Sequence, residues 1–288
     1  MKPLQGKIAI VAGSSRGAGR GIALALGDAG ATVYVAARTS RHGPKPADGA
    51  PGTVEDTAEE VSARGGWGIA VRADLGNEDE AAALFRRVDG EQGRLDLMID
   101  SAWGANFMPE WSKPFWALSA GIWRDTDATI NAAWLTSVHA ARIMVKQGGG
   151  LIIHVTDNLH PDPSAYRGQV LWDLGHEFLN RLVADMGREL KKSKVAVVGL
   201  NPGFMRTERV LMHMTTEAIK KQFRFDLSES VEYIGRAAAA LAADPEVLRK
   251  TGELLWAADL ATEYGFTDVD GRVIPVFDPK APVQAFPC

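Results

Sequence analysis

The 288-residue sequence lacks most features of secreted, membrane-bound and nucleic-acid-binding proteins. Its single cysteine, Cys288, excludes an intrachain disulfide, and so little cysteine suits a reducing compartment. The net charge of -4 provides no basic excess for nucleic acid or an anionic membrane. The most apolar helical run, at 237–243, is far too short to span a bilayer. We therefore expect a cytoplasmic protein without nucleic-acid or membrane partners.

The histidines and tyrosines of the chain are also few, which limits the possible chemistry. The chain has six histidines, and none stands with cysteine or acidic residues at the spacing of a metal site, so we predict no metal. It also has only four tyrosines, so few phenols are available as a general acid.

Apolar runs rich in β-branched residues alternate with segments of helical period along most of the chain. Such alternation predicts a doubly wound α/β fold, in which helices cover both faces of a parallel sheet. We expect a single domain over residues 1–288. Three segments break the alternation and are expected to form insertions on the substrate side: 39–53, 103–125 and 204–227.

A glycine-rich loop follows the first expected strand. Its sequence, AGSSRGAGRG, spaces Gly13, Gly17 and Gly19 as G-x-x-x-G-x-G at the start of a helix, with Ser15 and Arg16 between them. Glycines permit a tight turn and a close approach to a pyrophosphate, which the helix N-terminus attracts. A dinucleotide site is the favoured interpretation, and a tight strand-helix turn without ligand is the alternative.

The end of the second expected strand bears on the choice of cofactor. Sites that prefer NAD usually carry a carboxylate there for the ribose 2′-hydroxyl, but this strand ends in VAARTSR, with Arg38 at the place of the acid. A guanidinium binds a 2′-phosphate, and Arg16 could approach the same group. We therefore predict NADP(H), and interpret Arg41 as a surface charge.

These motifs together resemble the short-chain dehydrogenase/reductase family over nearly the whole chain. The resemblance rests on the glycine loop and on the following segments: RADL at 72–75, LDLMIDSAWG at 95–104, ADMGREL at 184–190 and NPGFMRT at 201–207. SKPFW at 112–116 and DLATEYGFTDVDGRVIP at 259–275 narrow it to one subgroup.

The resemblance implies a Rossmann domain with a seven-stranded parallel sheet. It implies that Asp74 and Leu75 lie at the adenine, and that Pro202, Gly203 and Thr207 surround the nicotinamide carboxamide. It also implies a homodimer or homotetramer formed through the helices near 121–147 and 168–192.

The catalytic residues depart from the family pattern. Family members use a tyrosine as acid, a lysine four residues later and a serine at the end of the preceding strand. Alignment on the downstream GREL places Trp172 at the tyrosine and His176 at the lysine, and Asp157 stands where the serine should be. Asn131 remains. Tyr166 is an alternative acid, but its i+4 partner is Val170, and using it would shift the helix off its apolar face.

The replacements suggest a different chemistry. Trp172 offers shape, an N–H donor or a π-face, and His176 could hydrogen-bond the nicotinamide ribose or titrate. An ionised Asp157 would stabilise an iminium cation, and a protonated one could donate a proton. Structural roles are the alternatives, with His176 as an ordinary helix residue and Asp157 as a cap or turn residue.

We therefore expect an NADP(H)-dependent reductase acting on a C=N or C=O bond. Six of the eight tryptophans fall between the fourth strand and the altered helix, which indicates a bulky apolar or aromatic substrate: Trp103, Trp111, Trp116, Trp123, Trp134 and Trp172. The alternatives are a catalytically silent NADP(H)-binding protein and a lyase or isomerase on the same scaffold.

Overall fold

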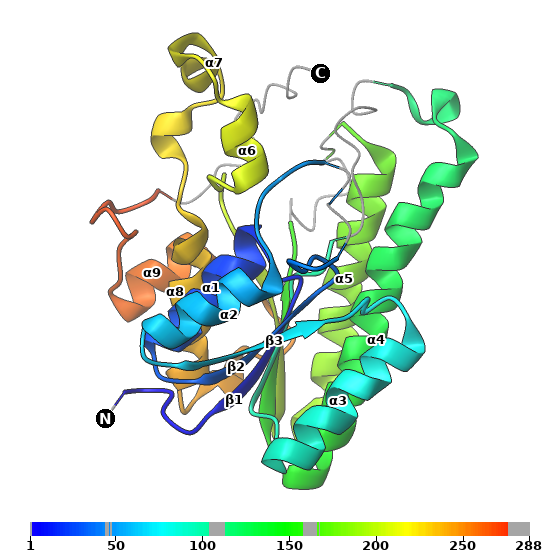
Figure 1. The fold of residues 1–288 in the computed structure, drawn as a ribbon, viewed down its shortest axis with the longest axis vertical. Helices are drawn as coiled ribbons and strands as arrows, with labels where there is room; N and C mark the ends of the chain where they lie inside the picture. The colour runs from blue at the N-terminus through cyan, green and yellow to red at the C-terminus, as the bar shows by residue number, and fades with distance from the viewer. Residues whose placement is uncertain are drawn as a thin grey trace.

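The computed structural model describes residues 2–43, 46, 48–103, 113–157, 166 and 168–275. Within them, seven parallel strands form one sheet in the order β3-β2-β1-β4-β5-β6-β7 (Figure 1). The strands are β1 Ile8–Ala12, β2 Thr32–Ala37, β3 Trp67–Arg72, β4 Leu97–Asp100, β5 Gly150–Val155, β6 Val195–Asn201 and β7 Leu254–Trp256. The predicted doubly wound α/β fold is confirmed.

Helices cover both faces of the sheet. In Figure 1, α1, α2, α8 and α9 lie on the left, and α3, α4 and α5 lie on the right. The α-helices are α1 Gly17–Asp28, α2 Val54–Ala63, α3 Glu78–Gln92, α4 Trp123–Gln147, α5 Val170–Leu190, α6 Glu208–His213, α7 Glu217–Gln222, α8 Val231–Ala243 and α9 Ala257–Tyr264. Short 3₁₀ turns are η2 Phe115–Ala117, η3 Ala120–Ile122, η4 Lys191–Ser193, η5 Phe225–Leu227 and η6 Val247–Lys250.

The sheet separates two apolar cores, because successive side chains of a strand point to opposite faces. In β1, Ala9 and Val11 pack in the core beneath α1, α2 and α8, whereas Ile8 and Ile10 pack in the core beneath α3, α4 and α5. Strands buried on both faces are continuously apolar, which is the pattern that the sequence displays.

Two of the three expected insertions, 204–227 and 103–125, contain short helices. Segment 204–227 contains α6, α7 and η5, which project above the sheet in Figure 1. Segment 103–125 contains η2, η3 and the start of α4, but residues 104–112, including Trp111, lie outside the described part. No helix in the described ranges is long and apolar enough to cross a membrane.

Candidate active site

The parallel strands bring the predicted site residues to one edge of the sheet. These residues, expected to contact the cofactor or the substrate, follow the carboxyl ends of the strands, which is where ligands of open α/β sheets bind. Along the sheet these residues are Arg38 after β2, the glycine loop after β1, Trp103 after β4, Asp157 after β5 and Pro202 after β6.

The glycine loop between β1 and α1 fits a dinucleotide pyrophosphate. A side chain at Gly13 or Gly19 would collide with backbone, since an added Cβ would lie 2.5 Å from the Ser101 oxygen or 2.4 Å from the Gly13 oxygen. Gly17 has φ +58°, and an added Cβ there would meet only the Thr207 methyl group, at 3.8 Å. The loop therefore needs glycine at 13 and 19 for its own close packing, and at Gly17 its backbone is open to the close approach that a phosphate makes at a helix N-terminus.

Two arginines predicted to bind a 2′-phosphate have different surroundings. Arg38 is exposed and makes no ion pair or side-chain hydrogen bond among the described residues. Arg16 donates to Asp48 at 3.1 Å, to the Ala50 carbonyl oxygen at 2.9 Å and to Thr39 Oγ1 at 2.9 Å. Arg38 is therefore the available cation, whereas Arg16 is already engaged. Ser15, next to it, is buried.

Arg41 belongs to a surface charge cluster. It donates to Asp56 and Glu59 on the first turns of α2. The hydrogen bonds from Thr53 and Arg41 lower the pKa of Asp56, and the hydrogen bond from Arg41 lowers the pKa of Glu59. Its contacts are those of a solvated surface charge.

The remaining predicted cofactor contacts lie at the expected strand ends. Asp74 Oδ1 accepts from the Gly76 N–H at 3.1 Å, and Leu75 is buried. Pro202 and Gly203 follow β6 and are half-buried. Thr207 is the N-cap of α6, where its Oγ1 accepts from the Val210 N–H at 3.2 Å.

Asp157, Trp172 and His176 form one cluster. The Asp157 backbone N–H donates to His176 Nδ1 at 2.9 Å, and Trp172 Nε1 donates to Asp157 Oδ2 at 3.3 Å. The Trp172 and His176 rings lie 4.7 Å apart, centroid to centroid. The structure therefore brings together the three residues that the sequence register predicts at the family's serine, tyrosine and lysine positions.

Gln169 fixes the start of α5, the helix that carries Trp172 and His176. It is the N-cap of α5, and its Oε1 accepts from the N–H groups of Leu171 at 2.5 Å and Trp172 at 3.0 Å. Because these N–H groups would otherwise lack a helical partner, the cap holds Trp172 in the first turn, beside the end of β5. Sequence reasoning missed this residue.

Trp103 completes the cluster from β4. Its indole stacks on the His176 ring with centroids 4.4 Å apart and an interplanar angle of 8°, and lies 5.0 Å from the Trp172 ring. A Cβ added to Gly175 would lie 3.1 Å from the Trp103 ring, so a larger residue there would push the ring by a few tenths of an ångström. Among the described residues, the Asp157 carboxylate thus lies at the Trp172 ring, which packs with the rings of Trp103 and His176.

A buried hydrogen bond supports the cluster from below. Thr156 Oγ1 donates to Asn180 Oδ1 at 2.8 Å and lies 3.4 Å from His176 Nδ1. Asn180 was also missed, although it stands four residues after His176 and so shares its helix face.

Asn131 and Tyr166 make no hydrogen bond or ring contact with this cluster among the described residues. Asn131 is exposed on α4, where its side chain donates to Asp127 Oδ2 at 3.5 Å. The α4 side chain that approaches Gly175 is Thr126, and five residues of helix rotate Asn131 by about 140° from it. Tyr166 is 62% exposed and has no hydrogen bond among the described residues. Their predicted catalytic roles receive no support from these positions.

A second polar cluster lies deeper in the core. His154 Nε2 is 3.0 Å from Ser137 Oγ, and His154 Nδ1 is 3.4 Å from Asp100 Oδ2. This order of side chains resembles a hydrolase triad, but all three residues are buried, so a substrate cannot reach Ser137. Asp100 Oδ1 also accepts from the Ala102 N–H at 3.1 Å, which ties the cluster to the residue before Trp103.

Glu229, whose carboxyl is buried, supports the loop after β6 through its backbone. Glu229 accepts from the Arg206 N–H at 2.8 Å and donates to the Phe204 oxygen at 2.9 Å, in both cases through its backbone. Burial raises the pKa of its carboxyl to about 8, and nearby Asp268 adds to the rise, while the Gly203 N–H and Arg206 oppose it. The side chain is therefore largely neutral at pH 7.

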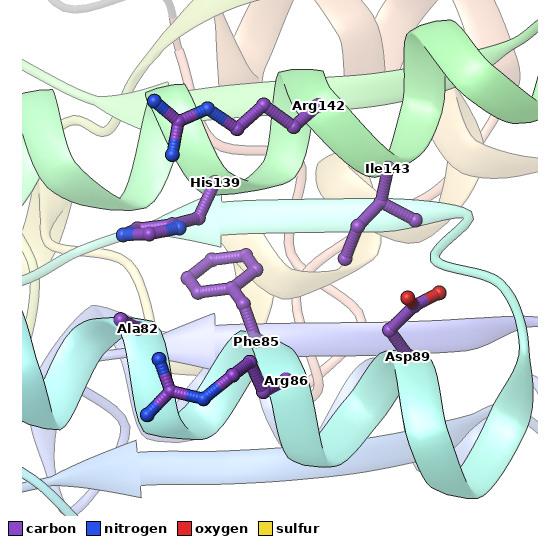
Figure 2. Close-up of a pocket in the computed structure, with 7 residues that line it drawn as sticks. All are labelled: Ala82, Phe85, Arg86, Asp89, His139, Arg142 and Ile143. Atoms are coloured by element: carbon purple, nitrogen blue, oxygen red, sulfur yellow. The ribbon is translucent and has the colours of Figure 1, made fainter.

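A pocket of about 270 Å³ lies elsewhere, between α3 and α4 (Figure 2). Arg86, His139 and Arg142 gather at one end of it, around the Phe85 ring, and Asp89 and Ile143 lie at the other. It is lined by the middle of α3 and the second half of α4, away from the strand ends. The described residues contain no group of three or more metal-ligating side chains.

Comparison with known proteins identifies the family. A family model of short chain dehydrogenases matches residues 7–218. The chain belongs to the short-chain dehydrogenase family. Two curated members are similar over 94% of this chain and 86% of their own length: dehydrogenase/reductase SDR family member 1 from Homo sapiens, 36% identical, and from Mus musculus, 38% identical. The subgroup resemblance in the sequence is therefore confirmed.

A solved structure of the short-chain dehydrogenase family also resembles the fold. It is 7α-hydroxysteroid dehydrogenase in complex with NADH and 7-oxo glycochenodeoxycholic acid. The TM-score is 0.71 at 25% sequence identity, over 88% of this chain and 93% of that one. Family membership implies a nicotinamide cofactor and an oxidoreductase activity.

Proposed function

We propose that the protein is an NADP(H)-dependent reductase with an atypical catalytic centre. Its preferred reaction is reduction of a C=N bond, as an imine or iminium, in a bulky apolar or aromatic molecule, with C=O reduction as the less favoured reaction. The observation that carries the proposal is the Asp157–Trp172–His176 cluster, which offers a carboxylate among aromatic rings in place of a phenol and an ammonium.

Arg38 supports the cofactor preference. It is exposed after β2 without an ion-pair partner among the described residues, and a guanidinium binds a phosphate through paired, charged hydrogen bonds. A carboxylate, which would accept from the 2′-hydroxyl of NAD(H), is absent from this position. When bound, the cofactor would supply the hydride to the substrate carbon.

The charges of the site favour an iminium over a ketone. Ketone reduction creates an alkoxide, which an ionised Asp157 would repel, whereas an iminium carries a positive charge that the same carboxylate attracts. The faces of Trp103 and Trp172 add attraction for a cation or a flat ring. An iminium carbon is already electrophilic, so its reduction does not depend on a phenol.

The similar fold of 7α-hydroxysteroid dehydrogenase supports a large apolar substrate for this protein. That protein binds a bile-acid derivative, and here the aromatic walls of the site are Trp103 and Trp172. Apolar rings with few polar groups are typical of pockets for such molecules.

The proposal extends to assembly and location. We propose one domain over residues 1–288 that forms a homodimer or homotetramer through α4 and α5, where Trp134, Val145 and Leu174 are exposed. A cytoplasmic location remains a prediction from the single cysteine.

Cofactor oxidation in the presence of cyclic imines and matched ketones tests the proposed reaction. We expect imine turnover, and we expect Asp157→Asn to lower its kcat by about 100-fold while NADPH still binds. Asp185→Asn is the control, because Asp185 lies on α5 well beyond Trp172 and His176 and pairs with Arg181. Imine turnover that survives Asp157→Asn, or turnover of the ketones without turnover of the imines, contradicts the proposal.

The silent NADP(H)-binding protein is the second candidate. It is favoured by the loss of the family's tyrosine and lysine beside an intact glycine loop. Tight NADPH binding without turnover on a broad imine and carbonyl panel would support it. A lyase or isomerase would instead convert substrate without net oxidation of the cofactor.

A further inference from the structure

A carboxylate of the protein lies at the N-terminus of α1. Glu208, the first residue of α6, accepts a hydrogen bond from the Gly17 backbone N–H through Oε2 at 2.7 Å. Gly17 is the first residue of α1, and the first turn of α1 contains no acidic residue of its own. The positive end of this helix is therefore neutralised by a side chain from a distant part of the chain.

A second carboxylate links the same two regions. Asp48 accepts from Arg16 of the glycine loop at 3.1 Å and from Arg209 of α6. Although burial alone would raise the pKa of Asp48, the hydrogen bond from Arg209 and the charges of both arginines hold it below the usual value. Asp48 is therefore ionised at neutral pH.

Both carboxylates occupy groups that the cofactor would use. This step rests on the proposed function, in which the start of α1 binds the pyrophosphate and Arg16, with Arg38, binds the 2′-phosphate. One N–H cannot fully satisfy a carboxylate and a phosphate together, and two anions at hydrogen-bond distance from one donor repel each other. Each phosphate must therefore compete with a carboxylate for its donor.

We propose that Glu208 and Asp48 are internal competitors of the cofactor, each opposing a different phosphate. Glu208 opposes the pyrophosphate, which NAD(H) and NADP(H) share. Asp48 opposes the 2′-phosphate, which only NADP(H) carries, and is thus a determinant of cofactor specificity. Cofactor binding thus breaks the Glu208–Gly17 contact between α6 and the glycine loop, and separately breaks the Arg16–Asp48 pair, whose carboxylate also binds Arg209 of α6.

Binding measurements without substrate separate the two effects. The Kd of NADPH and of NADH is measured by nicotinamide fluorescence for the wild type, Glu208→Gln and Asp48→Asn. We expect Glu208→Gln to lower both Kd values by a similar factor, about five- to tenfold. We expect Asp48→Asn to lower the Kd of NADPH by about as much and to change that of NADH by less than about twofold.

Glu217→Gln on α7 is the control, because Glu217 is exposed, pairs only with Lys220 among the described residues and should change neither Kd. Asp48→Ala repeats the test should Asn disturb the loop, and thermal unfolding verifies that each variant is folded. Unchanged Kd values in folded Glu208→Gln and Asp48 variants overturn the inference, as does equal tightening of both nucleotides by the Asp48 variants.

The same measurements distinguish this inference from the proposed function. A wild type that binds NADH but not NADPH contradicts the cofactor preference, while tightening of NADH by Glu208→Gln would still support Glu208 as a competitor. If neither nucleotide binds to the wild type or to any variant, both proposals are wrong.

Discussion

His176 Nδ1 accepts the backbone N–H of Asp157 at 2.9 Å, which fixes the protonation state of the imidazole. A ring nitrogen that accepts from an N–H carries no proton, so the proton of the neutral ring is on Nε2. The sequence register predicts this position to be that of the family's lysine, and here it holds a neutral hydrogen-bond donor. Asp157 is then the acidic member of the three-residue cluster.

His176→Ala is expected to destabilise the fold as well as the site. The substitution leaves the Asp157 N–H without its acceptor and removes the ring beneath Trp103. The free energy of unfolding should fall by about 2–4 kcal/mol. Urea denaturation measures it, with Glu189→Ala, an exposed residue of the same helix, as the control. A loss as small as that of the control would mean that His176 contributes no packing.

The sequence predicted the strand-helix order well, because buried parallel strands and amphipathic helices have strong periodic patterns. The edge strand β7 was not located, since three residues, Leu254–Trp256, are too few to display a period. Trp172 and His176 could be assigned to the site because downstream GREL fixed their register.

The contacts between distant segments could not be predicted. Glu208 meets Gly17 across 191 positions, and Asp48 meets Arg209 across 161, through loops that carry no periodic signal. Trp103 was noted as one of six clustered tryptophans, but its stacking on His176 depends on how β4 and α5 meet in space. Such contacts arise from tertiary packing, which local patterns do not encode.

Arg38→Gln tests the predicted 2′-phosphate contact. Removal of the guanidinium should raise the Kd of NADPH by about 10- to 100-fold, because a charged hydrogen bond to phosphate is lost, and should affect NADH little. Arg41→Gln is the matched control, since Arg41 is engaged by Asp56 and Glu59. We measure both Kd values by fluorescence titration. Equal effects of Arg38→Gln on the two nucleotides would exclude a 2′-phosphate contact.

Glu229 should make stability depend on pH between its two pKa values. Its carboxyl has a pKa of about 8 in the folded chain, against an ordinary value of 4.5. The folded state therefore holds this proton more tightly, so the contribution of Glu229 to stability is largest below about pH 4.5 and is lost as pH rises to about 8.

Glu229→Gln should remove this part of the pH dependence. The maximal slope that it removes is about 1.4 kcal/mol per pH unit, and the variant should be more stable than the wild type at pH 8. Denaturation curves at pH 5, 6, 7 and 8, chosen as roughly even steps across the window, measure the difference. If the free energy of unfolding changes with pH equally in the wild type and the variant, Glu229 is ionised in the folded protein across this range.

Trp134→Lys tests the predicted interface on α4. Trp134 is 53% exposed, and burial of so large an apolar side chain is a strong driving force for association. A lysine there should shift the assembly toward monomer in light scattering coupled to size exclusion. Trp116→Lys is the control, because Trp116 is 76% exposed but lies in η2, outside α4 and α5. If Trp134→Lys retains the mass of a wild-type oligomer, the oligomer forms through another surface. If the wild type itself has the mass of a monomer, the proposed assembly is wrong.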